Sequence, residues 1–292
     1  MTVAAHAKAN LFLRVLSKDT TGYHSIETLF TLLELADELT VERIDRGIEL
    51  TVAGAETGPA EENLAYRAAQ MVLDATGGTF GVRLHLEKRI PVGAGLGGGS
   101  SDGAAALHAV NALGGTAVPS HEILQFAAQL GSDVAFFASG APMALAWGHG
   151  ERMFRLPAPP AAPALVAVPP FGVNTGKAYA ELDDSRGDAK WFRGGVALDA
   201  DAFATWGGIG RLGGNDFESP VFGKEPTIRT LYERLAATRP LLVRLTGSGA
   251  AVIAIYRNER DRDGAAMEVG EKEARLMKTS TRPSPAPPPR PA

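Results

Sequence analysis

The chain has 292 residues and no cysteine, which excludes disulfides and thiolate metal sites, and its six histidines lack the spacing of a metal-binding motif. With 45% hydrophobic and 21% charged residues, it has the composition of a folded protein and is long enough for two domains. The net charge of −4 comes from mixed acidic and basic residues, the N-terminus lacks a signal-peptide core, and no apolar run reaches the roughly 20 residues that span a bilayer. We therefore expect a cytoplasmic protein that binds neither nucleic acid nor membrane.

The first half of the chain is predicted to mix strands with helices. Apolar, β-branched or alternating segments predict strands at 11–16, 26–33, 37–44, 48–52 and 82–86. Helical periodicity and end signals predict helices at 62–75, 101–113 and 120–130. Gly114-Gly115 ends the second helix, while Ser120 is expected to cap the third and Gly131 to close it.

The second half begins with a proline-rich stretch, 156–170, that contains one predicted strand at 164–168 and indicates the passage into a second domain. The glycine- and aspartate-rich residues 183–214 give no secure assignment. Further on, a helix is predicted at 227–238 and strands at 241–245 and 251–256. Six prolines in 282–292 predict a disordered tail. The elements do not alternate regularly, which favours an α+β fold with domains 1–155 and 156–281.

The most informative segment, 91–106, reads PVGAGLGGGSSDGAAA, with five glycines at positions 93–99. Glycines let backbone N–H groups approach an anion, and the helix that follows presents its positive end to the same place. Hydroxyls beside these groups suit a polyphosphate with Mg²⁺. The alternative is a flexible loop with a capping serine. We expect ATP to contact Pro91, Val92, Gly93, Ala94, Gly95, Leu96, Gly97, Gly98, Gly99, Ser100 and Ser101.

Three other phosphate motifs fit this chain less well. Gly93, Gly95 and Gly98 match G-x-G-x-x-G, but no acidic residue lies between Asp102 and Glu122, where a Rossmann fold requires one. The H-R-D and D-F-G signatures of protein kinases are missing. The segment 172–177 has one residue too few for a Walker A motif, and alanine follows its lysine.

The glycine-rich segment resembles the second motif of the GHMP kinases, the homoserine, mevalonate and galactose kinase superfamily. Residues 7–13 (AKANLFL) with Gly22-Tyr23-His24 are similar to its first motif, and residues 245–250 (LTGSGA) to its third. Together with residues 215–218 (NDFE), which we interpret as structural, these motifs resemble the branch that phosphorylates a CDP-linked sugar alcohol. The likeness runs from about residue 5 to residue 256.

The resemblance implies the two-domain GHMP kinase fold, with an N-terminal domain like domain 2 of ribosomal protein S5 and a C-terminal α/β plait. It makes Asp133 the catalytic carboxylate, where the residues alone would favour a helix cap. Lys8 would pair with Asp133, since a lysine among apolar residues needs a partner unless its head is exposed. The family usually has proline at position 135, where this chain has alanine.

The resemblance also implies a substrate site. Tyr23 and Tyr179 would stack on the cytosine and His24 would hydrogen-bond its edge, although Tyr179 equally suits a core position. Asn10 is expected either to bind the substrate or to bond to nearby backbone, and Asn63 either to contact the nucleoside of ATP or to cap a helix. Additional expected substrate contacts are Thr175, Gly247 and Ser248.

The expected reaction moves the γ-phosphate of ATP to the 2-hydroxyl of the CDP-linked sugar alcohol in the non-mevalonate isoprenoid pathway. Mg²⁺ would arrive with ATP, and Ser101 is a candidate ligand for it. Two alternatives are another GHMP kinase, such as a homoserine or mevalonate kinase, and a catalytically silent nucleotide-binding protein. The sequence leaves open whether the chain is a monomer or a homodimer.

Overall fold

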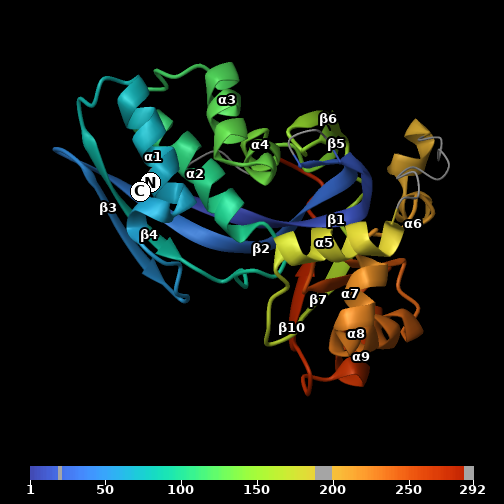
Figure 1. Cartoon of the computed structure of the whole chain (residues 1–292). Helices are drawn as coiled ribbons and strands as arrows, with labels where there is room; N and C mark the ends of the chain where they lie inside the picture. Colours follow the sequence, from blue (N-terminus) through green and yellow to red (C-terminus); the bar gives the residue numbers. More distant parts are fainter. Residues whose placement is uncertain (19–21, 188–198, 286–292) are drawn as a thin grey trace.

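The structure, a computed structural model of the whole chain, describes residues 1–18, 22–187 and 199–285 (Figure 1). Two lobes, each built around one sheet with helices against it, lie side by side. This arrangement confirms the predicted two-domain α+β fold. Within the described residues, no helix is both long and apolar enough to cross a bilayer.

The N-terminal lobe holds a six-stranded sheet in the order β3-β4-β2-β5-β6, with β1 paired to β2. The pairing is antiparallel except between β3 and β4, which run parallel. Its strands are β1 (Thr2–Lys18), β2 (His24–Ile44), β3 (Ile48–Ala53), β4 (Gly81–Glu87), β5 (Met143–Gly148) and β6 (Arg152–Leu156).

Strands β1 and β2 are longer than predicted. The two strands expected at 26–33 and 37–44 form one, which also includes residues 34–36. Asp37, within it, accepts hydrogen bonds from the backbone of Arg89 and Ile90 and from Lys88. Strand β1 begins at Thr2 and not near Leu11, since its alanine-rich start is buried against β2 and the helices despite weak strand propensity.

Helices cover one face of this sheet: α1 (Leu64–Ala75), α2 (Gly98–Leu113), α3 (Ser120–Leu130) and α4 (Ser132–Ala138), with a short 3₁₀ turn, η1 (Ala60–Glu62), before them (Figure 1). Their apolar faces and those of β2 and β4 form one core. The helix expected from Ser101 already begins at Gly98. The prediction that Ser120 caps α3 was wrong, because Pro119 occupies the cap position and Ser120 is the first helical residue.

The C-terminal lobe holds an antiparallel sheet in the order β10-β7-β9-β8. Its strands are β7 (Pro163–Val168), β8 (Leu242–Leu245), β9 (Val252–Ile255) and β10 (Arg275–Ser280). Its helices are α5 (Thr175–Arg186), η2 (Ala200–Ala204, 3₁₀), α6 (Trp206–Gly210), α7 (Glu218–Lys224), α8 (Pro226–Ala237) and α9 (Glu259–Val269). The sequence did not predict α9 and β10, and part of the unassigned segment, 188–198, lies outside the described residues.

The lobes share a core, because Leu11 and Leu29 of the first sheet join one apolar cluster with Val166 and Ile253 of the second. The proline-rich stretch joins the lobes, since β6 and β7 belong to different sheets. The chain end then returns to the first lobe. Arg282, expected to open a disordered tail, donates its backbone N–H to Leu32 and pairs with Glu34, so the prediction was wrong for this residue. Residues 286–292 lie outside the described part.

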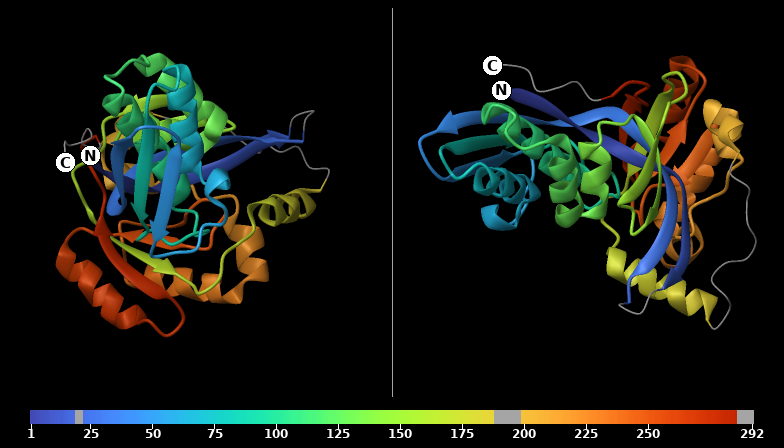
Figure 2. Two further views of the ribbon diagram at one scale, coloured as in Figure 1. Left: turned by 90° about the vertical axis from the view of Figure 1, so that its left-hand side faces the viewer. Right: turned by 90° about the horizontal axis from the view of Figure 1, so that it is seen from above.

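Helix α5 packs against α7 and lies next to the end of the β1–β2 pair at which the two strands are joined (Figure 2). Asp183 of this helix bonds to Lys18 and His24, which lie at that end of the two strands. These bonds join the C-terminal lobe to the N-terminal lobe at one side of the candidate active site.

Candidate active site

The glycine-rich segment forms a tight loop ahead of α2. Gly95 and Gly97 have φ angles of 79° and 73°, a left-handed conformation that glycine adopts without strain. A Cβ atom at Gly95 would lie 2.1 Å from the carbonyl oxygen of Thr246, so the loop lies directly against the third motif. Because Gly97 precedes the first turn of α2, the N–H groups of that turn have no acceptor within the helix and can bind an anion.

A cavity of about 350 Å³ lies beside this loop. Residues 91–100 line it, together with Asn63, Lys88 and Asp102, so most of the expected nucleotide contacts share one space. Asn63 caps α1 by accepting from the N–H of Ala65 at 2.9 Å. It also lines the nucleotide cavity, so capping the helix and contacting the nucleoside of ATP are compatible roles. Ser101 is the exception, because it lines a different cavity next to His6.

Lys8 and Asp133 lie together, as expected, although they come from β1 and α4. Their Nζ and Oδ2 atoms are 3.4 Å apart. The lysine side chain is 4% exposed and the aspartate 33% exposed, so the carboxylate remains open to a ligand. Gly131 occupies the cap position of α4, so Asp133 is not the helix cap and lies in its first turn. A Cβ atom at Gly97 would lie 3.0 Å from Cγ of Lys8, which places the pair at the loop.

Asn10 holds Lys8 in this position. Its Oδ1 accepts from Nζ of Lys8 at 2.7 Å and from the N–H of Gly247 at 2.9 Å, while its Nδ2 donates to Thr28 at 2.7 Å. The residue is buried. In this arrangement Asn10 orients the lysine and connects the first motif to the third. Its side chain is already engaged, and the backbone group that it bonds belongs to Gly247 and not to a neighbouring residue.

A second cavity, of about 570 Å³, contains four of the expected substrate contacts: Tyr23, His24, Thr175 and Tyr179. The rings of His24 and Tyr179 stack with centroids 4.5 Å apart, and those of Tyr23 and His149 stack at 5.2 Å. Ser132, next to Asp133, also lines this cavity. Burial, helped by the negative charge of Asp133, raises the pKa of Tyr179 to about 12, so the phenol stays protonated.

Sequence reasoning missed Asp183 and His149. Asp183 accepts from Nε2 of His24 at 2.8 Å and from Nζ of Lys18 at 2.9 Å. Partial burial works to raise the pKa of Asp183, but these two hydrogen bonds outweigh it and hold the pKa below its usual range. The sequence did contain a signal for Asp183, because it lies four residues after Tyr179 and therefore on the same face of α5. No comparable pattern pointed to His149.

The third motif supports the loop. Thr246 donates its hydroxyl to the carbonyl of Gly95 at 3.0 Å, and the N–H of Ala251 donates to Ala94 at 3.1 Å. Gly247 and Ser248 do not line the second cavity, but the Ser248 hydroxyl lies 3.0 Å from that of Thr175, which does.

The NDFE segment is structural in this arrangement. Asn215 donates from Nδ2 to the carbonyls of Leu245 and Gly247, at 2.8 and 2.7 Å. Glu218 accepts from the N–H of Leu245 at 3.1 Å. These bonds fix the end of β8 and the turn that meets the glycine-rich loop.

A buried charged group lies on the other side of the loop. Nζ of Lys88 donates to Asp37 and, at 2.7 Å, to Asp102, and all three side chains are at most 3% exposed. Oδ1 of Asp102 has no hydrogen-bond partner among the described residues. Burial raises the pKa of Asp102 to about 7, because the positive charge of Lys88 is shared with Asp37 and does not compensate for it. Sequence reasoning missed this group, although Lys88 and Asp102 flank the loop.

Comparison with known proteins defines the class to which this fold and site belong. Residues 63–141 match the family model of the GHMP kinases N terminal domain, and residues 198–274 match that of the GHMP kinases C terminal domain. A solved homoserine kinase from Cytophaga hutchinsonii shares the fold, with a TM-score of 0.67, 19% identity and coverage of 98% of this chain and 96% of that one.

Other relatives are more similar. Two 4-diphosphocytidyl-2-C-methyl-D-erythritol kinases, from Pelotomaculum thermopropionicum and Solibacter usitatus, are each 36% identical to this chain. The matches cover 96% and 87% of this chain and 98% and 80% of the respective relative. The crystal structure of a 4-(cytidine 5'-diphospho)-2C-methyl-D-erythritol kinase has a TM-score of 0.82 and 35% identity, covering 96% of this chain and 99% of that one. The chain therefore belongs to the 4-diphosphocytidyl-2-C-methyl-D-erythritol kinase family of the GHMP kinases.

Proposed function

We propose that the chain transfers the γ-phosphate of ATP to the 2-hydroxyl of 4-diphosphocytidyl-2-C-methyl-D-erythritol, a step of isoprenoid precursor synthesis in the cytoplasm. The observation that carries this proposal is the position of the Lys8–Asp133 pair. Lys8 lies against Gly97 of the nucleotide cavity, and Asp133 follows Ser132 of the second cavity. A phosphate donor and an alcohol acceptor in the two cavities would meet at this pair.

In the proposed reaction, the acceptor oxygen attacks the γ-phosphorus and the bond to the β–γ bridging oxygen breaks, releasing ADP. Asp133 orients the hydroxyl and takes its proton. Lys8 and the first N–H groups of α2 offset the negative charge that develops on the transferred group. Holding both reactants in one geometry supplies much of the remaining acceleration.

The second cavity would hold the cytidine diphosphate. The exposed face of Tyr23 can stack on a pyrimidine, and His24, held by Asp183, would face its edge. Homoserine and mevalonate carry no base that could use these rings. Both cavities and the pair come from a single chain, so the proposal holds for a monomer and for a homodimer alike.

Mg²⁺ would enter bound to the phosphates of ATP, where it would help neutralise their charge. It prefers oxygen donors, and Ser100 in the nucleotide cavity and the partly exposed carboxylate of Asp133 are candidates. Ser101 is a poorer choice than the sequence indicated, since it lines the cavity that contains His6.

The proposal is tested by offering the purified chain Mg-ATP with each of three acceptors: the cytidine-diphosphate substrate, homoserine and mevalonate. We expect ADP release with the first alone, together with a new phosphomonoester signal in the ³¹P NMR spectrum. Faster turnover of homoserine or mevalonate would assign the chain to another GHMP activity. Tight ATP binding without turnover of any acceptor would instead support the catalytically silent alternative.

A further inference from the structure

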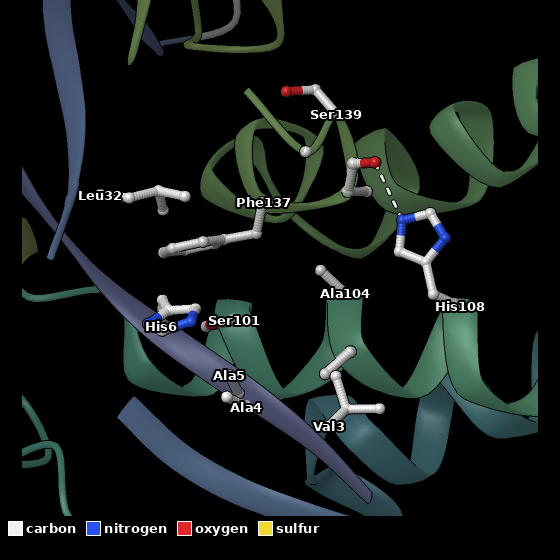
Figure 3. Close-up of a pocket in the computed structure, with 13 residues that line it drawn as sticks. Val3, Ala4, Ala5, His6, Leu32, Ser101, Ala104, His108, Phe137 and Ser139 are labelled. Carbon is white, nitrogen blue, oxygen red and sulfur yellow. Dashed lines mark hydrogen bonds between the residues drawn. The ribbon is translucent and has the colours of Figure 1, made fainter. Parts of the chain in front are cut away.

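Two histidines stack on tyrosines in the second cavity, His24 on Tyr179 and His149 on Tyr23. His108, by contrast, lines the separate cavity shown in Figure 3, where its ring donates to a backbone carbonyl. The function proposed above uses His24 and both tyrosines, and it gives His149 no role.

The ring of Tyr23 lies at the open side of the second cavity. It is 66% exposed and directly precedes β2. A ring in contact with that much solvent can take several orientations, and binding a base by stacking restricts it to one. A partner that already holds the ring in that orientation lowers the entropy lost on binding.

His149 is placed to be such a partner, because the turn between β5 and β6 fixes its backbone. Gly148 and Gly150 on either side of it have φ angles of 74° and 108°, which glycine adopts without strain. The N–H of His149 donates to Oε2 of Glu151 at 2.8 Å. A Cβ atom at Gly150 would lie 3.2 Å from Cβ of Ser132, so the turn packs against the start of α4.

The two rings form a regular stack. Their centroids are 5.2 Å apart and their planes differ by 29°, within the range of favourable aromatic pairs. The imidazole of His149 covers one face of the Tyr23 ring. A pyrimidine base stacks on a single face of its partner, so the opposite face of Tyr23 remains for the base.

We propose that His149 is a positioning residue for the base of the substrate: by stacking on one face of Tyr23, it holds that ring in the orientation in which the other face receives the cytosine. This inference rests on the proposed function, since it places the CDP-linked substrate in the second cavity. His149 acts through Tyr23 on substrate binding and takes no part in the transfer of the phosphoryl group.

The test uses CDP as the probe, because its binding to the intact chain can be followed by titration calorimetry without turnover. We expect His149→Ala to weaken CDP binding by roughly 2- to 10-fold, the range that one aromatic stack provides. His149→Phe keeps a ring and should retain the wild-type affinity. His121→Ala removes an exposed histidine of α3 outside the cavity and should have no effect. Melting temperatures establish that each variant is folded.

A double-mutant cycle separates positioning from direct contact with the ligand. Tyr23→Ala removes the ring through which His149 acts, so adding His149→Ala to it should weaken CDP binding no further. In turnover assays, His149→Ala should raise the KM for the cytidine-diphosphate substrate and leave kcat and the KM for ATP close to the wild-type values.

Unchanged CDP affinity in a folded His149→Ala chain, or an equal loss in the Tyr23→Ala background, would overturn the inference and leave the proposed function in place. CDP binding by His149→Phe as weak as that of His149→Ala would show that the imidazole contacts the ligand itself, which also contradicts the positioning role. A wild-type chain that binds no CDP would overturn the proposed function and this inference with it.

Discussion

Two lysine–carboxylate groups lie on either side of the glycine-rich loop, and they differ in how far their hydrogen-bonding capacity is used. Lys88 is enclosed by Asp37 and Asp102, with all three side chains buried. Lys8 meets Asp133 at 3.4 Å, longer than a good charge-assisted hydrogen bond, and a third of the aspartate is exposed. The enclosed group holds backbone in place, whereas the open pair retains capacity for a ligand.

The comparison shows that a buried charge does not by itself indicate a catalytic residue. Asp37 fixes the backbone at residues 89 and 90, directly ahead of the loop, and Lys88 connects this point to Asp102 in the first turns of α2. The enclosed group therefore helps to set where the N–H groups at the start of α2, which we propose to bind phosphate, point. Lys8 and Asp133 lie where the reacting groups would meet. The variants below change either the enclosed group around Lys88 or the proposed catalytic region, which comprises Lys8, Asp133 and the second cavity.

Removing the charge of Lys88 should produce the largest effect. Lys88→Met leaves two buried carboxylates without a cation and should lower the free energy of unfolding by about 3–5 kcal/mol, measured by urea denaturation. Arg83→Met, on the adjacent strand β4, is the matched control, and its exposed pair with Glu49 should matter far less. Equal losses in the two variants would show that the enclosed group does not stabilise the fold.

Removing the charge of Lys8 should act on catalysis. Lys8→Met keeps the apolar stem but removes a positive charge from the transferred phosphate, so kcat should fall by roughly 10²–10³-fold. The unfolding free energy should change much less than in Lys88→Met, since Asp133 remains partly hydrated. Lys8→Arg should recover part of the rate. A stable Lys8→Met chain with normal kcat would end the proposed role.

Shortening Tyr23 should weaken substrate binding and little else. Loss of stacking on cytosine is worth about 1–3 kcal/mol, which corresponds to a rise in KM for the cytidine-diphosphate substrate of roughly 5- to 150-fold in Tyr23→Ala. The KM for ATP and the melting temperature should stay close to those of the wild type, because the ring is exposed. Phe154→Ala removes another exposed aromatic outside the cavity and should alter neither KM.

The enclosed group should also make stability depend on pH. Asp102 has a folded-state pKa raised to about 7, so between about pH 4 and pH 7 the folded chain binds a proton that the unfolded chain has released. Its contribution to stability should therefore fall as the pH rises through this window, by at most about 1.4 kcal/mol per pH unit. Asp102→Asn should remove this slope from the curve of unfolding free energy against pH. Parallel curves for wild type and variant would contradict the raised pKa.

The sequence predicted the parts of the site that depend on local pattern. Gly93, Gly95 and Gly97 adopt left-handed conformations, and Gly98 leaves no room for a Cβ atom beside Ile90 and Lys88. The order of the motifs let the family resemblance bring Lys8 near Asp133. Contacts between distant segments gave no such signal. Asp37 lies 51 residues from Lys88 along the chain, and nothing in the local pattern around either residue indicates that they meet.

The sequence also gave no indication of the direction in which several side chains point. Ser100 and Ser101 are adjacent in sequence, but the turn of α2 directs them to different cavities. For Asn10 the sequence left open a substrate contact and a bond to nearby backbone. Its partners in β1, β2 and the third motif became apparent only in the folded chain. Strand β10 was missed because its alternation is weak and its position is set by pairing with β7.

The most direct test of the central claim, that the open pair is catalytic and the enclosed group structural, is to measure kcat and the unfolding free energy of Asp133→Asn. We predict that kcat for the cytidine-diphosphate substrate falls by roughly 10²–10⁴-fold, while stability changes by less than about 1 kcal/mol. An Asp133→Asn chain that turns over at the wild-type rate, or that loses activity only because it unfolds, would contradict the account.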